Sequence, residues 1–152
     1  MPKLLFAFFL AFAIAPPASG QGLTTLPSAH SVRATLDRFA AAVRAEGWVV
    51  FIEIDHVAAA TAAQLSLAPR TVMIFGNPRS GTAAMAAHPT LALDLPMRVL
   101  VWEDASGRVW LTRSTGEDIA ERVFARHGMT IPNQGRAGTE ALMARLAQRA
   151  VE

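Results

Sequence analysis

The feature that most constrains the fold is an apolar strand that runs directly into a turn, within Thr71–Thr82. The uncharged residues Thr71–Phe75 are β-branched, aromatic or thioether-bearing, which predicts a strand buried on one or both faces. Gly76 and Asn77 tolerate positive φ angles, and Pro78 disfavours helical conformation at Asn77. The chain must therefore leave the sheet at this point and change direction.

A short helix is predicted to follow this turn, over Gly81–His88, with Ser80 or Thr82 as its N-cap. The first N–H groups of a helix have no partner within the helix. Such a corner would hold polar atoms over a rigid strand, which makes it the first candidate for a binding site.

Residues 1–20 are predicted to be a signal peptide, and residues 21–152 a single domain. A short positive segment, Met1-Pro2-Lys3, precedes the apolar run Leu4–Ile14, and Ala18-Ser19-Gly20 has the small residues of a cleavage site. An uncleaved anchor or a buried helix is the alternative. No cysteine follows the run, which excludes a lipoprotein anchor, and we expect an exported protein, periplasmic or secreted, with no stable membrane anchor after cleavage.

The composition excludes several kinds of chemistry. The chain has no cysteine and no tyrosine, and Lys3 is its only lysine. Disulfides and thiolate catalysis are therefore impossible, and Schiff-base chemistry and a P-loop lysine are excluded from the mature domain. Acidic and basic residues nearly balance and the arginines are scattered, so no nucleic-acid partner is expected.

Hydrophobic periodicity, caps and turn residues predict an alternation of strands and helices. The predicted strands are Gly22–Leu26, Trp48–Ile54, Thr71–Gly76, Arg98–Glu103 and Arg108–Arg113. The predicted helices, besides the one above, are Ser31–Glu46, His56–Gln64, one from Ser114 or Thr115 to His127, and Thr139–Ala150. We expect an α+β domain in which the first and last long helices cover one face of a mainly antiparallel sheet.

Five blocks in this order resemble the domain-of-unknown-function 302 family, over nearly all of the mature chain. The blocks are Phe51-x-x-Ile54-Asp55-His56, Ile74-Phe75-Gly76-Asn77-Pro78-x-x-Gly81-Thr82-x-x-Met85, Ala92-Leu93-Asp94-Leu95-Pro96, Val101-Trp102-Glu103-Asp104 and Arg126-His127-Gly128. The resemblance implies a TATA-box-binding-protein-like arrangement of strand, helix, four antiparallel strands and helix, here with short inserted helices, and it implies a homodimer. It implies no activity, and the fold name is not an indication of DNA binding.

Asp55 and His56 form one candidate catalytic pair, because a carboxylate beside an imidazole can perform acid–base chemistry. Together with Asp94 they would make a catalytic group, and His56, Asp94 and His127 are weak candidates for metal ligands. The alternative is structural: Asp55 would cap the next helix, and His127 would lie in the last turn of its own helix.

The corner is the candidate ligand site, because a helix N-terminus, hydroxyls and a guanidinium are groups that bind anions. Its residues are Gly76, Asn77, Arg79, Ser80, Gly81 and Thr82. Asp94 lies between two leucines and must be paired if buried; Arg79, Arg98 or the corner backbone are candidate partners. If the Asn77 amide donates to Asp94, Asn77→Asp should cost about 1–3 kcal/mol. The alternative is a tight turn in which Asn77 satisfies its own backbone.

Three functions remain open from the sequence. The first is an exported binding module that holds a small anion, metabolite or metal at the corner. The second is an enzyme, possibly hydrolytic in type, that uses Asp55, His56 and Asp94. The third is a structural module for dimerisation. Whether the protein is an enzyme, and which cofactor it would use, are not decided by these residues.

Overall fold

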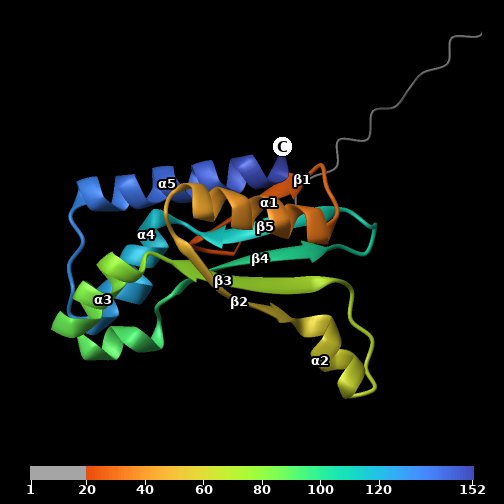
Figure 1. Ribbon diagram of the computed structural model, residues 1–152, viewed down its shortest axis with the longest axis horizontal. Helices are drawn as coiled ribbons and strands as arrows, with labels where there is room; N and C mark the ends of the chain where they lie inside the picture. The colour runs from red at the N-terminus through yellow and green to blue at the C-terminus, as the bar shows by residue number, and fades with distance from the viewer. Residues whose placement is uncertain (1–19) are drawn as a thin grey trace, which may run out of the picture.

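Five antiparallel strands form one sheet in the computed structural model, which describes residues 20–152 (Figure 1). Their order across the sheet is β1-β5-β4-β3-β2. The strands are β1 (Leu23–Ser28), β2 (Val49–Asp55), β3 (Arg70–Gly76), β4 (Met97–Glu103) and β5 (Val109–Ser114). β4 is the central strand, β5 and β3 flank it, and β1 and β2 form the edges. Every neighbouring pair is antiparallel, which confirms the predicted mainly antiparallel sheet. The predicted signal peptide falls outside the described residues, apart from Gly20.

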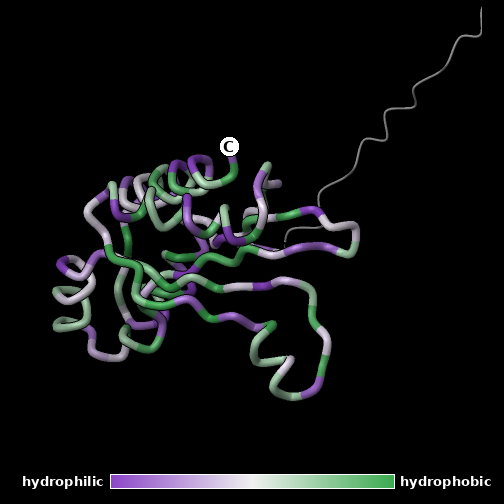
Figure 2. The backbone as a smooth tube through the Cα atoms, turned by 45° about the vertical axis from the view of Figure 1, so that its right-hand side comes forward, coloured by the Kyte–Doolittle hydropathy of each residue, from purple (hydrophilic) through white to green (hydrophobic). Residues whose placement is uncertain are grey.

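Two long helices, α1 (Val32–Ala45) and α5 (Asn133–Val151), lie side by side on one face of the sheet (Figure 1). α1 begins where predicted, because the Ser31 hydroxyl accepts a hydrogen bond from the Ala34 N–H. It ends at Ala45, with Glu46 as its C-cap and Gly47 after it at a φ of 72°. The side chain of Phe39 is fully buried and meets the ring of Phe75 in β3 edge-on, with 5.0 Å between centroids. Figure 2 shows the hydrophobic residues concentrated along the central strands below these helices.

Short helical segments fill the connections between these elements, so the predicted α+β order with inserted helices is confirmed. β2 and β3 are joined by α2 (His56–Ala62). α3 (Pro78–Ala87) and the 3₁₀ helix η1 (Pro89–Leu93) lie between β3 and β4. After β5 come α4 (Gly116–Asp118), the π-helical segment η2 (Ile119–Phe124) and the 3₁₀ turn η3 (Ala125–His127).

Several element boundaries differ from those predicted, each for a local reason. Pro27 does not end β1 but pairs with Trp110 within it, which an edge strand tolerates because its outer side needs no N–H donor. α5 begins at Asn133 rather than at Thr139, with Pro132 as its N-cap residue. The predicted helix after Thr115 does start there, but it continues as π and 3₁₀ turns before Gly128 ends it at φ 77°.

The packing of α1 predicts a stability test. Phe39→Ala should lower the free energy of unfolding by about 3–5 kcal/mol, because it removes a fully buried ring and leaves a cavity. Arg38→Ala, at an exposed position of the same helix, should change it by less than about 0.5 kcal/mol. Urea denaturation of both variants measures the difference, and a small loss for Phe39→Ala would mean that the ring does not fill the core.

Candidate functional site

The corner after β3 is organised by Asn77, which is the N-cap of α3. The Oδ1 atom of Asn77 accepts hydrogen bonds from the N–H groups of Arg79, at 3.0 Å, and of Ser80, at 3.5 Å. The Gly81 N–H donates to the Asn77 carbonyl oxygen at 2.9 Å. Pro78 has no N–H, so every donor of the first turn of α3 is accounted for. The predicted caps Ser80 and Thr82 are corrected to Asn77, and the helix starts three residues earlier than expected.

The anion-binding prediction depended on free donors at this helix end, and Asn77 occupies them. Arg79, the predicted guanidinium of the site, does not line the adjoining cavity. The turn therefore has the geometry of the structural alternative, in which Asn77 satisfies its own backbone.

A cavity of about 700 Å³ opens beside this corner. Five of the six predicted ligand residues line it: Gly76, Asn77, Ser80, Gly81 and Thr82. None of the residues that line it carries an ionisable side chain. The others are Trp48, Phe51, Pro78, Ala84, Met85, Leu95, Pro96, Met97, Ile119, Phe124, Met129, Ile131, Gly135, Gly138, Thr139 and Leu142.

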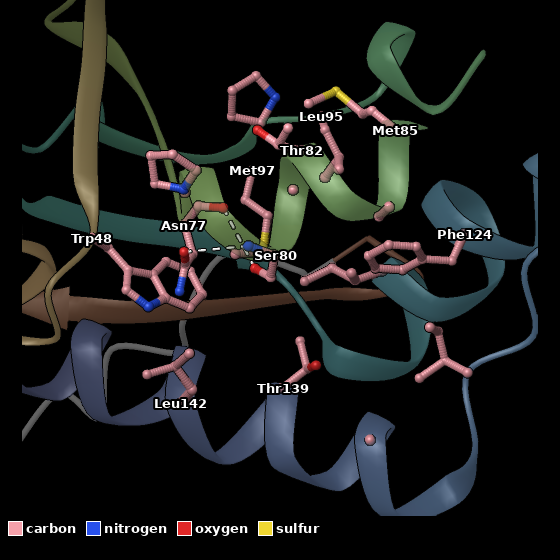
Figure 3. A pocket seen from close by; sticks show the side chains of 18 of the residues that line it. Trp48, Asn77, Ser80, Thr82, Met85, Leu95, Met97, Phe124, Thr139 and Leu142 are labelled. Carbon is pink, nitrogen blue, oxygen red and sulfur yellow. Dashed lines mark hydrogen bonds between the residues drawn. The ribbon is translucent and has the colours of Figure 1, made fainter. Parts of the chain in front are cut away.

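The walls of the cavity come from segments that are far apart in the sequence (Figure 3). Trp48 stands immediately before β2 and stacks on Phe75 of the core, with 6.4 Å between ring centroids. Ile119 and Phe124 are the first and last residues of the π-helical segment η2. π-helical turns frequently occur at functional sites. The α5 wall carries Gly138, and a Cβ atom added there would meet no other atom within 4 Å. Helix α5 thus leaves open space at this point.

Polar groups on the cavity wall are few and uncharged. In Figure 3 the side chains of Asn77, Ser80 and Thr82 lie at the corner, and Thr139 stands on α5 opposite them. The side-chain oxygen of Asn77, Oδ1, accepts from backbone N–H groups, whereas the side-chain nitrogen, Nδ2, is a donor still available to a ligand. The site can therefore surround an apolar molecule and direct it with hydrogen bonds at one end.

Asp94 belongs to a second polar cluster at the same end of the sheet, formed with η3. Its Oδ2 atom lies 2.7 Å from His127 Nε2 and accepts from Arg126 Nη1 at 3.1 Å. These groups lower the pKa of Asp94: the hydrogen bond to His127 has the largest effect, the charges of Arg126, His127 and Arg98 act in the same direction, and desolvation opposes them. The expectation that Asp94 must be paired is confirmed. Its hydrogen-bonding partners are Arg126 and His127 in place of the expected Arg79 and corner backbone, and the expected Arg98 acts through its charge alone.

Asp55 and His56 lie at the other end of the sheet from Asp94. Asp55 pairs with Thr71 near the start of β3, and the corner begins at Gly76, where that strand ends. Gly76 comes five residues after Thr71, which is about 16 Å along a strand at about 3.3 Å per residue. Asp55 caps α2 by accepting from Val57 N–H at 2.8 Å, which confirms the structural interpretation. The structure therefore does not bring Asp55 and His56 together with Asp94, nor His56 together with His127. Within residues 20–152, no group of three or more His, Cys, Asp or Glu side chains is placed to hold a metal ion.

Several cavity residues were missed by sequence reasoning. Trp48 lies in a predicted strand, and Gly135 and Gly138 lie between two predicted helices, so none of them was a candidate for the site. The Asn-Pro dipeptide at the start of α3 was a local signal that could have corrected the cap, because Asn is a preferred N-cap and Pro a preferred first helical residue.

Comparison with known proteins assigns the family. This is an α+β domain with one helix-covered antiparallel sheet and an uncharged cavity at its end. The family model described as "Domain of unknown function DUF302" matches residues 24–146, and the chain belongs to that family. The crystal structure of uncharacterized conserved protein DUF302 from Bacillus stearothermophilus superposes with a TM-score of 0.70 over 86% of this chain and 99% of that one. At 14% identity this similarity shows the fold alone.

Curated relatives match over a smaller part of their length. Fluoride-specific ion channel FluC 1 of Brucella suis biovar 1 (strain 1330) is 48% identical over 101 residues, which are 66% of this chain and 40% of that protein. FluC 1 of Brucella abortus biovar 1 (strain 9-941) has the same identity over the same number of residues, 37% of its length. The match thus spans about two fifths of these relatives. Among residues 20–152 of this chain, no helix has the length and apolar character to cross a membrane.

The role of Asn77 as a cap predicts the effects of two substitutions. Asn77→Ala should destabilise the protein by about 0.5–2 kcal/mol, because two N–H groups lose their acceptor. Asn77→Asp should keep the free energy of unfolding within about 0.5 kcal/mol, because Asp caps helices equally well and its charge is favourable at a helix N-terminus. Chemical denaturation at neutral pH compares the two. A loss of 1–3 kcal/mol for Asn77→Asp would instead support the earlier expectation that the amide donates to a carboxylate.

Proposed function

We propose that this domain binds a neutral, mainly apolar small molecule in the cavity beside α3. The observation that carries the proposal is a cavity of about 700 Å³ whose lining contains no ionisable side chain. Its volume lies within the roughly 300–1,000 Å³ that is typical of small-molecule sites. Its lining of aromatic, aliphatic and thioether groups with a few polar atoms is also typical of such sites.

The absence of charge in the lining favours a neutral ligand over an ion. An ion that entered this cavity would lose hydration without gaining a counter-charge, which costs several kcal/mol or more. The N–H groups at the start of α3 would not replace that hydration, because Asn77 already accepts from them. Of the anion, metabolite and metal considered from the sequence, an uncharged metabolite therefore fits the lining best.

The ligand we propose has an acceptor such as a carbonyl or ether oxygen at one end. The amide nitrogen of Asn77 and the hydroxyl of Thr139 are donors on opposite walls (Figure 3). Met85, Met97 and Met129 supply flexible, polarisable contacts, which allow a site to adapt to the outline of an apolar ligand. The fluoride named in the Brucella relatives is not included in the proposal, since that match leaves more than half of those proteins uncovered.

Filling the cavity tests the proposal with the neutral probe N-phenyl-1-naphthylamine. Gly138→Leu should weaken saturable binding of the probe at least tenfold, because Gly138 lines the cavity and a bulky side chain there has open space to occupy beside it. Gly138→Ala is the matched control, and it should retain binding. Both variants should be at least as stable as the parent protein, since replacing Gly within a helix gains about 0.5–1 kcal/mol.

Fluorescence titration of the probe and thermal melting of each variant measure these outcomes. A parent protein without saturable binding at near-equimolar stoichiometry would contradict the proposal. So would equal binding by a well-folded Gly138→Leu variant.

We also propose that the domain forms the homodimer that its family resemblance implies, through β2. β2 is an edge strand, and its side chains Phe51, Ile52 and Ile54 are 51%, 54% and 40% exposed. The strand and the α2 segment after it project from the body of the molecule (Figures 1 and 2). An exposed apolar edge is normally protected or paired, and a second copy offers the same edge in return.

A charge placed on this edge should prevent the pairing. Ile52→Lys should convert the dimer to a monomer in sedimentation velocity experiments, whereas Leu93→Lys, at the 74% exposed leucine of η1, should leave it intact. A parent protein that is monomeric at 100 μM, or a dimer that persists in Ile52→Lys, would rule out this interface.

Export remains part of the proposed function. It is supported by the positive start, the apolar run and the small residues before Gln21, within a segment that lies outside the described residues apart from Gly20.

A further inference from the structure

We propose that Thr90 is a nucleophile activated by His127 and Asp94, and that this cluster cleaves esters of short apolar acids. The three side chains form a continuous series of hydrogen bonds. Thr90 Oγ1 lies 2.9 Å from His127 Nδ1, and His127 Nε2 lies 2.7 Å from Asp94 Oδ2. A hydroxyl, an imidazole and a carboxylate in this order are the groups of a hydroxyl-activating triad, which is recognised by geometry and not by chain order.

The position of each proton follows from the partners. An ionised carboxylate only accepts hydrogen bonds, so His127 Nε2 must carry the proton that it shares with Asp94. In the neutral form of His127 the imidazole has one N–H, so Nδ1 is then the acceptor and the Thr90 hydroxyl donates to it. This is the arrangement that a general base needs in order to take the hydroxyl proton.

The surroundings hold the base in place and leave the hydroxyl accessible. The side chain of His127 is 5% exposed and that of Asp94 is 21% exposed, whereas Thr90 is exposed. Arg126 Nη1 donates to both oxygens of Asp94, at 3.3 and 3.1 Å. The carbonyl oxygen of His127 lies 3.1 Å from His88 Nδ1, which fixes the backbone of η3 as well. A substrate can reach Thr90 without displacing the base.

An exposed leucine beside Thr90 indicates the class of acyl group. Residues three apart on a 3₁₀ helix eclipse one another, so Leu93 lies on the same side of η1 as Thr90. Leu93 is 74% exposed, so its side chain is open to a molecule that approaches Thr90. When the carbonyl carbon of an ester lies next to the Thr90 hydroxyl, Leu93 can contact the apolar chain of its acyl group. The substrate class is therefore a small ester with a short apolar acid.

The reaction balances with water as the only co-reactant. Thr90 Oγ1 attacks the ester carbonyl carbon while its proton passes to His127 Nδ1. The bond from that carbon to the alcohol oxygen then breaks, and the alcohol leaves with the proton from Nδ1. Water repeats the sequence on the acyl-Thr90 ester, releases the acid and restores the hydroxyl.

Acetylation by p-nitrophenyl acetate tests the proposal on the full chain. The chain has no cysteine, no tyrosine and a single lysine at position 3, so its histidines are the main competing nucleophilic side chains. Acid-quenched protein should carry one acetyl group on Thr90 in peptide mass spectrometry. Release of p-nitrophenol should fall at least tenfold in Thr90→Val, which has nearly the same shape, and should persist in Thr90→Ser.

Asp94→Asn tests whether Asp94 assists catalysis or only holds η3 in place. It should lower the acetylation rate and change its pH profile, because an amide in place of the carboxylate no longer favours protonation at Nε2. Circular dichroism confirms that each variant is folded. Acetyl groups on other residues only, or equal rates in folded Thr90→Val and parent protein, would overturn the proposal. None of the three residues lines the cavity, so this result is independent of ligand binding there.

Discussion

The structure depends on the burial of one face of the sheet beneath α1 and α5. With no cysteine in the chain, no disulfide supports this packing, and it must come from non-covalent contacts, most of them apolar. The edge-on contact between Phe39 and Phe75 lies at its centre, and both rings are fully buried. Phe75 also supports Trp48, which forms part of the cavity wall. The packed core and the candidate site therefore share a side chain.

The cavity exists because α5 is held in a position that leaves space between it and the corner. Arg113 of β5 is 4% exposed, and its guanidinium donates to the carboxylate of Glu140 on α5 at 2.6 Å. Glu140 also accepts from the Gly116 N–H at 2.7 Å. Gly116 has no room for a side chain, because a Cβ atom would lie 2.5 Å from the Arg136 carbonyl oxygen. These contacts hold α5 against α4, and the glycine at position 138 leaves the neighbouring space empty.

Two polar arrangements of different character occupy this end of the sheet. At the corner, Asn77 neutralises the helix end by hydrogen bonding, which leaves an uncharged surface suited to an apolar ligand. Beyond α3 and η1, Asp94 is held ionised by His127 and Arg126, and it does not line the cavity. The segregation of charge from the cavity keeps the two proposed activities physically separate.

The order and type of most elements, and the caps at Ser31 and Asp55, were determined by the sequence alone. Such signals act within a few residues, through hydrophobic period and through side chains that bond the nearest backbone N–H groups. The importance of Asn77 could be predicted for the same reason. Of its two predicted sets of partners, the local backbone is the one found, and the long-range contact with Asp94 is not.

Only the tertiary structure decided which residues meet across the chain. His127 lies 33 residues after Asp94 and Arg126 lies 32 residues after it, and no periodicity relates them. The separation of Asp55 from Asp94 follows from strand register, and the cavity follows from how far α5 stands from the corner. Local patterns specify elements because each residue interacts with its near neighbours, whereas register and helix placement depend on the packing of the whole core.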